Sequence, residues 1–171
     1  MNANTLKLLP AFLLAGMTLL VSCSREEPTL APVPPVVLGD VQINEIYSRG
    51  TTTDPDWVEL YNPSSVQVNI SGYKIYDAGG QGGTKPKKEI PAGAVIPAKG
   101  FYVIVTDGTG ASDFGLSSAG EQVWLENTAG TLIDAVTFTA MDVTQTYGRY
   151  PDGGTTWQLL NTITRGTANR P

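Results

Sequence analysis

The 171-residue sequence has no histidine and a single cysteine, Cys23. The lack of histidine removes the usual imidazole base of serine and cysteine hydrolases and the commonest zinc ligand. One cysteine cannot form an intramolecular disulfide, so a folded unit of this chain depends on its apolar core. Hydrophobic residues make up 41% of the chain, which is enough for such a core. No window after residue 40 shows a helical period in its apolar residues, which favours a domain without helices.

The N-terminal segment has the features of a bacterial export signal. An apolar run over residues 8–21 follows Lys7 and leads into residues 20–23, Leu-Val-Ser-Cys. The run has about 14 residues, whereas a membrane-spanning helix needs about 20, so it predicts a secretory signal. Residues 20–23 resemble the lipobox of bacterial lipoproteins, in which the cysteine is acylated and becomes the new N-terminus. We therefore predict a signal peptide over residues 1–22 and a mature protein held to a membrane by lipid on Cys23.

Residues 23–39 are predicted to be the lipidated cysteine and a Pro-rich linker. Prolines at positions 28, 32, 34 and 35 favour an extended, semi-rigid chain. Position 25, two residues after the cysteine, is Arg. An Asp at this position tends to retain lipoproteins at the inner membrane, so Arg25 favours sorting to the outer membrane. Glu26 and Glu27 resemble short signals for export to the outer surface, and a soluble linker is an equal alternative. We therefore expect lipid anchoring in the bacterial cell envelope, at the outer membrane, with surface exposure left open.

From Asp40 onward the pattern is that of an all-β domain. Short segments rich in Val, Ile, Tyr, Phe and Trp are separated by clusters of Gly, Asn, Asp and Pro. Short strands with closely spaced turns are typical of a sandwich or barrel, here spanning residues 40–171. The predicted strands lie near residues 40–47, 56–62, 66–70, 72–77, 100–106, 121–126, 131–138, 145–150 and 157–160.

One predicted strand has two faces of different chemistry. Val58 and Leu60 form an aliphatic face, and the opposite face carries Trp57 and Tyr61 around Glu59. A carboxylate between two aromatics needs hydrogen-bond donors if it is even partly buried.

The same alternation places residues 101, 103 and 105 on one side of their strand. It also turns Val123 and Leu125 inward, so we expect Trp124 to be half exposed or at an edge.

Several short motifs occur in a fixed order along the domain. They are residues 43–46 (Ile-Asn-Glu-Ile), 57–62 (Trp-Val-Glu-Leu-Tyr-Asn), 70–73 (Ile-Ser-Gly-Tyr), 90–93 (Ile-Pro-Ala-Gly), 96–100 (Ile-Pro-Ala-Lys-Gly), 148–149 (Gly-Arg), 151–153 (Pro-Asp-Gly) and Trp157. Together they resemble the lamin tail domain family over about residues 40–169. The resemblance implies an immunoglobulin-like β-sandwich without a common catalytic site or cofactor. It also implies a non-enzymatic module, used in lamins for interaction with proteins and reportedly with DNA.

Four polar residues could form one cluster: Asn44, Glu45, Glu59 and Arg149. One interpretation is a polar ligand site on one sheet. The other, which we favour, is a structural network in which Arg149 bridges carboxylates by bidentate hydrogen bonds and fixes strand register.

The candidate ligand contacts are aromatic or basic. Trp124 and Tyr102 could offer exposed aromatic surface, and Lys85, Lys87 and Lys88 form the only candidate basic patch. Without the signal peptide, Lys plus Arg falls from 11 to 10 against 16 acids, giving a net charge of −6. An acidic body repels phosphate backbones, so nucleic acid is an unfavoured partner and a solvated hairpin tip is the preferred interpretation of the lysines.

Two pairs of loop acids are weak calcium candidates: Asp54 with Asp56, and Asp107 with Asp113. Ca²⁺ takes six to eight oxygen ligands, and neither stretch has dense acid spacing, so solvated turn residues are favoured. No other metal site is expected.

The sequence thus predicts a non-enzymatic, lipid-anchored envelope module that binds protein partners or serves adhesion. Its affinity would come from loops and exposed aromatics or from an unpaired sheet edge. Binding of carbohydrate or of extracellular DNA is the alternative.

Overall fold

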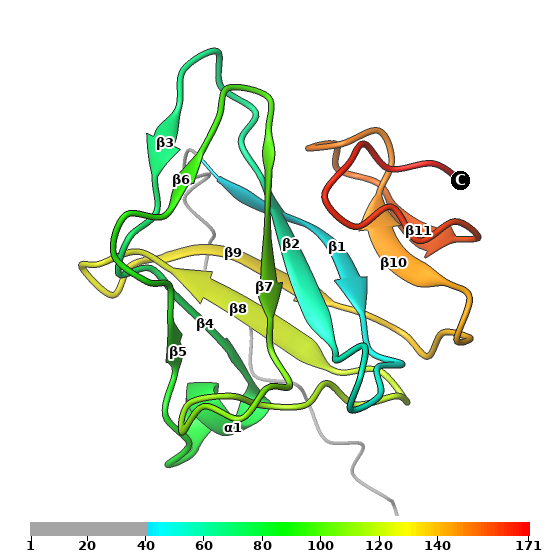
Figure 1. Cartoon of the computed structure of the whole chain (residues 1–171), viewed down its shortest axis with the longest axis horizontal. Helices are drawn as coiled ribbons and strands as arrows, with labels where there is room; N and C mark the ends of the chain where they lie inside the picture. The colour runs from blue at the N-terminus through cyan, green and yellow to red at the C-terminus, as the bar shows by residue number, and fades with distance from the viewer. Residues whose placement is uncertain (1–40) are drawn as a thin grey trace, which may run out of the picture. The chain divides into compact units, whose positions relative to one another are not determined.

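Two antiparallel sheets pack face to face in residues 41–171, the part of the chain that the computed structural model describes (Figure 1). The first has the order β11-β10-β1-β2-β7, the second has the order β5-β4-β8-β9, and β3 pairs with β6 in a small third sheet. The first sheet contains β1 (Gln42–Tyr47), β2 (Trp57–Tyr61), β7 (Phe101–Val105), β10 (Thr146–Arg149) and β11 (Trp157–Leu160). The others contain β3 (Val68–Asn69), β4 (Lys74–Asp77), β5 (Lys88–Glu89), β6 (Val95–Ile96), β8 (Gln122–Glu126) and β9 (Leu132–Thr137).

The all-β prediction is confirmed, and each of the nine predicted strands is found. Sequence reasoning missed β5 and β6, because each has two residues and two residues carry no periodicity. The expectation of a domain without helices is wrong for one turn, α1 (Ala78–Gly82), where the Asp77 carboxylate accepts a hydrogen bond from the Gly80 N–H at 3.1 Å. The signal peptide, Cys23, the linker and Asp40 lie outside the described residues.

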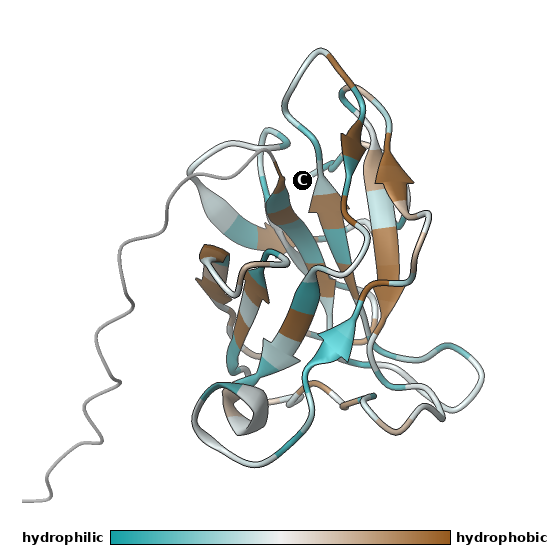
Figure 2. Ribbon diagram, turned by 90° about the vertical axis from the view of Figure 1, so that its left-hand side faces the viewer, coloured by the Kyte–Doolittle hydropathy of each residue, from teal (hydrophilic) through white to brown (hydrophobic). Residues whose placement is uncertain are grey.

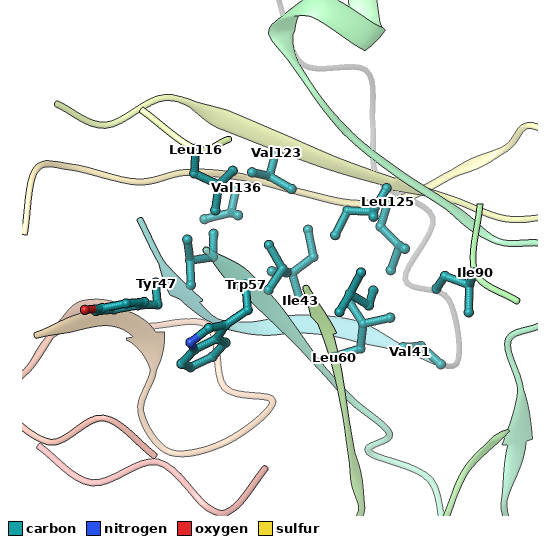
Figure 3. Close-up of a cluster of buried hydrophobic side chains, with 14 of the residues drawn as sticks. Val41, Ile43, Tyr47, Trp57, Leu60, Ile90, Leu116, Val123, Leu125 and Val136 are labelled. Atoms are coloured by element: carbon teal, nitrogen blue, oxygen red, sulfur yellow. The ribbon is translucent and has the colours of Figure 1, made fainter. Parts of the chain in front are cut away.

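The core forms where the aliphatic faces of the two sheets meet. Val123 and Leu125 are fully buried, as predicted, and Figure 3 shows them facing Ile43 and Leu60 of the first sheet. Hydrophobic and hydrophilic residues alternate along the strands in Figure 2, because successive side chains of a strand point to opposite faces. Burying each such aliphatic side chain contributes about 1.5–3 kcal/mol, so this core is the main source of stability.

A β-bulge in β1 gives the first sheet a polar second face. Ile43 pairs with Leu60 and Glu45 pairs with Glu59, which leaves Asn44 as the extra residue. A bulge shifts the alternation by one residue. Ile43 and Ile46 therefore both join the core, while Asn44 and Glu45 both face away from it.

The closing segment, residues 150–171, adds β11 to the edge of this sheet, and its residues 152–153 and 164–169 cover the second face. Figure 3 shows Trp57 and Tyr47 on the side of the sheet opposite the aliphatic core, and their rings stack at 5.9 Å between centroids. The guanidinium of Arg165 lies 5.6 Å from the centre of the Trp57 ring. The predicted division of β2 into an aliphatic face and an aromatic face around Glu59 is thus confirmed.

Asn62 joins the end of β2 to two neighbouring turns. Its buried amide group donates hydrogen bonds to the carbonyl oxygens of Val66 at 2.7 Å, Ile96 at 3.2 Å and Pro97 at 2.9 Å. Its side-chain oxygen accepts one from the Ser64 N–H at 2.9 Å. The side chain therefore serves as a donor and as an acceptor at one buried position.

We predict that Asn62→Asp destabilises the fold by roughly 2–4 kcal/mol, because the carboxylate would face carbonyl oxygens without donating to them. Urea unfolding monitored by circular dichroism measures the change. Asn69→Asp is the matched control: Asn69 is exposed and only accepts a hydrogen bond, from the Ser71 N–H, which Asp also accepts. Equal stability of the two variants would contradict the prediction.

Candidate functional site

Glu59 lies beneath the closing segment with no exposed surface, at 0%. One carboxylate oxygen accepts a hydrogen bond from the Gly166 N–H at 2.6 Å, and the other accepts one from the Asn44 amide at 3.3 Å. The donors that a buried carboxylate in β2 requires are therefore present, and one comes from residues more than a hundred positions away.

Glu45 lies beside Glu59 and is equally inaccessible, at 0% exposed. One of its oxygens accepts from the Thr146 hydroxyl at 2.6 Å and from the Thr164 N–H at 3.1 Å. The other accepts from the Thr164 hydroxyl at 3.0 Å. The two glutamates thus bind the closing segment to β1 and β2 through backbone and hydroxyl donors.

The bulged Asn44 is held by the same segment. Its amide donates to the Asp152 carboxylate at 2.9 Å, and its side-chain oxygen accepts from the Gly153 N–H at 3.1 Å. Asn169 donates to the Asn44 carbonyl at 3.2 Å and to the Arg149 carbonyl at 2.8 Å. Asn44 is fully buried, and its side-chain amide and carbonyl groups are both hydrogen-bonded within the protein.

The expectation that Arg149 bridges these glutamates is wrong. Arg149 binds both oxygens of Asp134, at 3.0 and 3.3 Å, and its Nε donates to the Ile43 carbonyl at 2.7 Å. Side chains alternate along β10, and Thr146 already faces Glu45, so Arg149 must face the opposite side of the sheet. Alternation shows from the sequence that Thr146 and Arg149 face opposite sides of the sheet, but only the tertiary structure shows which of the two faces Glu45.

Burial raises the pKa of Glu59 from its ordinary 4.5 to about 8, against the opposing effect of the hydrogen bonds from Gly166 and Asn44. Burial also raises the pKa of Glu45 and of Asp134, in the latter case despite the nearby Arg149 guanidinium. Desolvation disfavours the charged form of each acid. Glu59 is therefore largely protonated at neutral pH.

The three lysines do not form an open basic patch. Lys85 pairs with Asp77 at 3.3 Å, Lys87 pairs with Glu126 at 2.5 Å, and Lys88 pairs with Asp113. The interpretation as a solvated hairpin tip fits Lys85, whose side chain is 63% exposed, but not the other two, which are partly buried. The acids that neutralise Lys87 and Lys88 lie far away in the sequence, so composition alone could not identify them.

The aromatic candidates differ in accessibility. Trp124 is only 7% exposed, and its ring stacks on Tyr76 at 6.0 Å with an interplanar angle of 7°, so the prediction of a half-exposed edge position is wrong. The reason is its place in β8, a central strand whose register sets Trp124 opposite Tyr76. Tyr102 is half-buried and lines a hollow beside β7.

The four calcium candidates are dispersed. The Asp56 carboxylate accepts hydrogen bonds from two backbone N–H groups at 2.7 and 2.8 Å, Asp54 pairs with an arginine of the closing segment at 3.2 Å, and Asp113 pairs with a lysine. Asp107 is exposed. Within residues 41–171 no three Asp, Glu, Cys or His side chains lie together in a way that could hold a metal ion.

Within residues 41–171 one edge of the first sheet is open. Among these residues β7 pairs with β2 alone, and Figure 1 shows it in front of the other strands of its sheet. Two backbone hydrogen bonds flank the β2–β7 ladder. At one end the Asn62 N–H donates to the Gly100 carbonyl, and at the other end the Thr106 N–H donates to the Asp56 carbonyl. In an antiparallel pair the bonded residues alternate, so residues 100, 102, 104 and 106 bond to β2.

The backbone N–H and C=O groups of Phe101, Val103 and Val105 therefore point to the free edge. A hollow of about 280 Å³ lies beside this edge, lined by residues 88–91 on one side and 102–105 on the other.

The comparisons with known proteins agree with this architecture. A family model described as Lamin Tail Domain matches residues 35–140. The chain belongs to the lamin tail domain family. The lamin tail domain is an immunoglobulin-like β-sandwich, and no enzyme family is indicated. The match ends before β10, so the residues at 148–157 that contribute to the resemblance lie beyond it.

A comparison with curated proteins found no match for this lamin tail domain protein. In the described part of the chain, no helix has the length and apolar character needed to cross a membrane.

We predict that the stability of the protein falls as the pH rises from 4.5 through about 8, because Glu59 titrates near 4.5 when unfolded and near 8 when folded. Its contribution is present in full below pH 4.5 and is lost as the pH passes the folded pKa. Thermal unfolding across this range measures the effect. Glu59→Gln, which stays neutral, should flatten the profile, whereas Glu89→Gln, an exposed control, should not. Parallel profiles for wild type and Glu59→Gln would contradict the prediction.

Proposed function

We propose that this protein is a non-enzymatic binding module, held to the bacterial cell envelope by lipid on Cys23, that recruits a protein partner by strand addition at β7. Unpaired strand edges bind extended segments of other chains through main-chain hydrogen bonds. The single observation that carries the proposal is the open edge of β7.

The composition of β7 supports this role. Most edge strands are protected from pairing by charges, prolines, bulges or short length. β7 is Phe-Tyr-Val-Ile-Val, without charge, proline or glycine, and it is longer than β11, the other edge strand of its sheet. The second sheet ends in β5, which has two residues, both charged. At its other edge β9 carries Asp134, which accepts a hydrogen bond from the β1 backbone.

The hollow beside β7 supplies space for the side chains of an added strand. Tyr102 and Ile104 line it from β7, and Ile90 and Pro91 line it from the opposite side. Alternate side chains of a strand paired to β7 would enter this space, because every second side chain points to the same face. Aliphatic residues at those positions match the apolar part of the lining.

The other functions weighed for this chain have less support. Carbohydrate binding by aromatic side chains such as Tyr47, Trp57 and Tyr76 would need accessible ring faces, but all three residues are buried. DNA binding by Lys85, Lys87 and Lys88 would need free cations, but each is paired with an acid.

We expect Cys23→Ala to move the full-length chain from the membrane fraction to the soluble fraction and to abolish its labelling by a fatty acid analogue. The physical reason is that the acyl chains supply the membrane affinity, at about 0.8 kcal/mol per buried methylene. Fractionation and labelling in a bacterial host measure both effects. Membrane retention of the unlabelled variant would contradict lipid anchoring while leaving the role of β7 open to its own test.

We expect Val103→Pro to reduce capture of envelope proteins by the full-length chain about tenfold, because proline lacks the N–H that points to the free edge. The β2–β7 hydrogen bonds do not use that group, so thermal unfolding should remain close to wild type. Val103→Ala keeps the N–H and is the control. Quantitative mass spectrometry of proteins captured from envelope extract provides the comparison, and equal capture by a folded Val103→Pro variant would contradict strand addition.

A further inference from the structure

The chain enters the sandwich at the end where β1 begins. Gln42 at the start of β1 pairs with Tyr61 at the end of β2, and Tyr61 also pairs with Phe101, where β7 begins. Figure 1 shows the connections from β2 to β3 and from β6 to β7 at this same end. We call it the entry end, and its connections are residues 62–73, 91–100, 127–131 and 150–156. The connections of the opposite end are residues 48–56, 78–87, 106–121 and 138–145.

The two ends of the sandwich differ in charge. Three connections of the entry end carry a single charged residue, the exposed Lys99. The fourth carries Asp152, whose carboxylate accepts hydrogen bonds from the Asn44 amide at 2.9 Å and from the Asn169 N–H at 3.0 Å. The connections of the opposite end carry six acids and three bases, a net charge of −3. These residues are Asp54, Asp56, Asp107, Asp113, Glu121 and Asp142, with Arg49, Lys85 and Lys87.

The entry end also presents apolar surface to solvent. Val66, in the connection from β2 to β3, is 65% exposed, and Val95 of β6 is 37% exposed. The fold uses the backbone of Val66 and not its side chain, because the Val66 carbonyl accepts a hydrogen bond from the Asn62 amide at 2.7 Å. The side chain of Val66 is therefore available for contact with a surface outside the protein.

We propose that the entry end rests on the lipid surface to which the chain is anchored, with Val66 among the headgroups and the acidic opposite end turned away. The inference rests on the lipid anchor of the proposed function, because it names the part of the domain that the anchor brings to the membrane. A lipid surface fits this end of the molecule because it accepts exposed apolar side chains and does not repel an uncharged surface.

The point of attachment favours the same orientation. Residues 23–40 lie between the acylated cysteine and the start of the described domain, and 18 fully extended residues reach at most about 60 Å. They lead into the entry end. For the opposite end to contact the lipid, they would have to span the length of the strands as well, roughly 20 Å for the six residues of β1. The tether allows both orientations and makes contact by the entry end easier.

The lipid anchor makes a weak contact sufficient. A domain tethered by a short linker meets its surface at an effective concentration in the millimolar range. One exposed valine would not hold a free protein on a bilayer, but it can orient a protein that is already anchored. Anionic headgroups repel the acidic opposite end and attract Lys99, so electrostatics and apolar contact favour the same orientation.

Quenching of a fluorophore by spin-labelled lipid tests the orientation of the full-length lipidated chain. Val66→Cys and Val143→Cys are matched variants, since both replace an exposed valine, one at each end of the domain. Acylation occupies the thiol of Cys23, so only the introduced cysteine takes the label. In vesicles of phosphatidylethanolamine and phosphatidylglycerol, the probe at position 66 should be quenched at least about threefold more than the probe at position 143. Equal quenching, or stronger quenching at position 143, would overturn the orientation.

A charge at position 66 separates contact from proximity. Thr128→Cys carries a probe on another exposed connection of the entry end. Adding Val66→Asp should reduce its quenching at least about twofold, because a carboxylate is repelled by anionic headgroups and removes the apolar contact. Val143→Asp makes the same change at the opposite end and should leave the quenching unchanged. Thermal unfolding confirms that both variants fold, and equal quenching in the two would show that Val66 makes no contact with the lipid.

Failure of this inference differs from failure of the proposed function. If the chain takes no label from a fatty acid analogue, the lipid anchor and the orientation fail together. If the chain is labelled and floats with the vesicles, but positions 66 and 143 are quenched equally, the anchor stands and only the orientation is wrong. Strand addition at β7 is decided separately by envelope capture with Val103→Pro.

Discussion

The buried carboxylate of Glu59 is the interaction on which the arrangement of the first sheet depends. A carboxyl group without hydrogen-bond partners at this depth would oppose folding, and the backbone donor to Glu59 is the Gly166 N–H of the closing segment. Glu45 is likewise buried and accepts hydrogen bonds from the Thr146 hydroxyl and the Thr164 N–H. Satisfying both glutamates holds the closing segment against β1 and β2. With β10 and β11 added on the β1 side, β7 remains as the edge at the other end of the sheet.

The bulge in β1 makes this arrangement possible. Regular alternation would send Asn44 and Glu45 to opposite faces, with one of the two polar side chains in the core. The bulge turns both to the polar face and returns Ile46 to the core. The Lamin Tail Domain match includes both glutamates, whereas Thr146, Thr164 and Gly166 lie beyond its end at residue 140. The residues after 140 are therefore part of the fold of this member.

Polar side chains of this domain are largely engaged with one another. Lys87 and Lys88 neutralise acids on other segments, Arg149 neutralises Asp134, and Asp56 is satisfied by backbone donors. Charged groups engaged in this way are poorly suited to bind a charged ligand, because a ligand would first have to displace their present partners. Main-chain groups at a free strand edge have no such competitor. For that reason the proposed function places recognition on the backbone of β7.

Local alternation was enough to predict the strands and their faces. Val58, Leu60, Val123 and Leu125 lie in the core as expected, since a side chain's face follows from its position in a period of two residues. The same reasoning showed that Glu59 requires donors. Tertiary structure alone decided three contacts. They are the hydrogen-bond donors to Glu59, the pairing of Arg149 with Asp134, and the stacking of Trp124 on Tyr76. Each depends on the register between segments distant in sequence, and a two-residue period carries no information about that register.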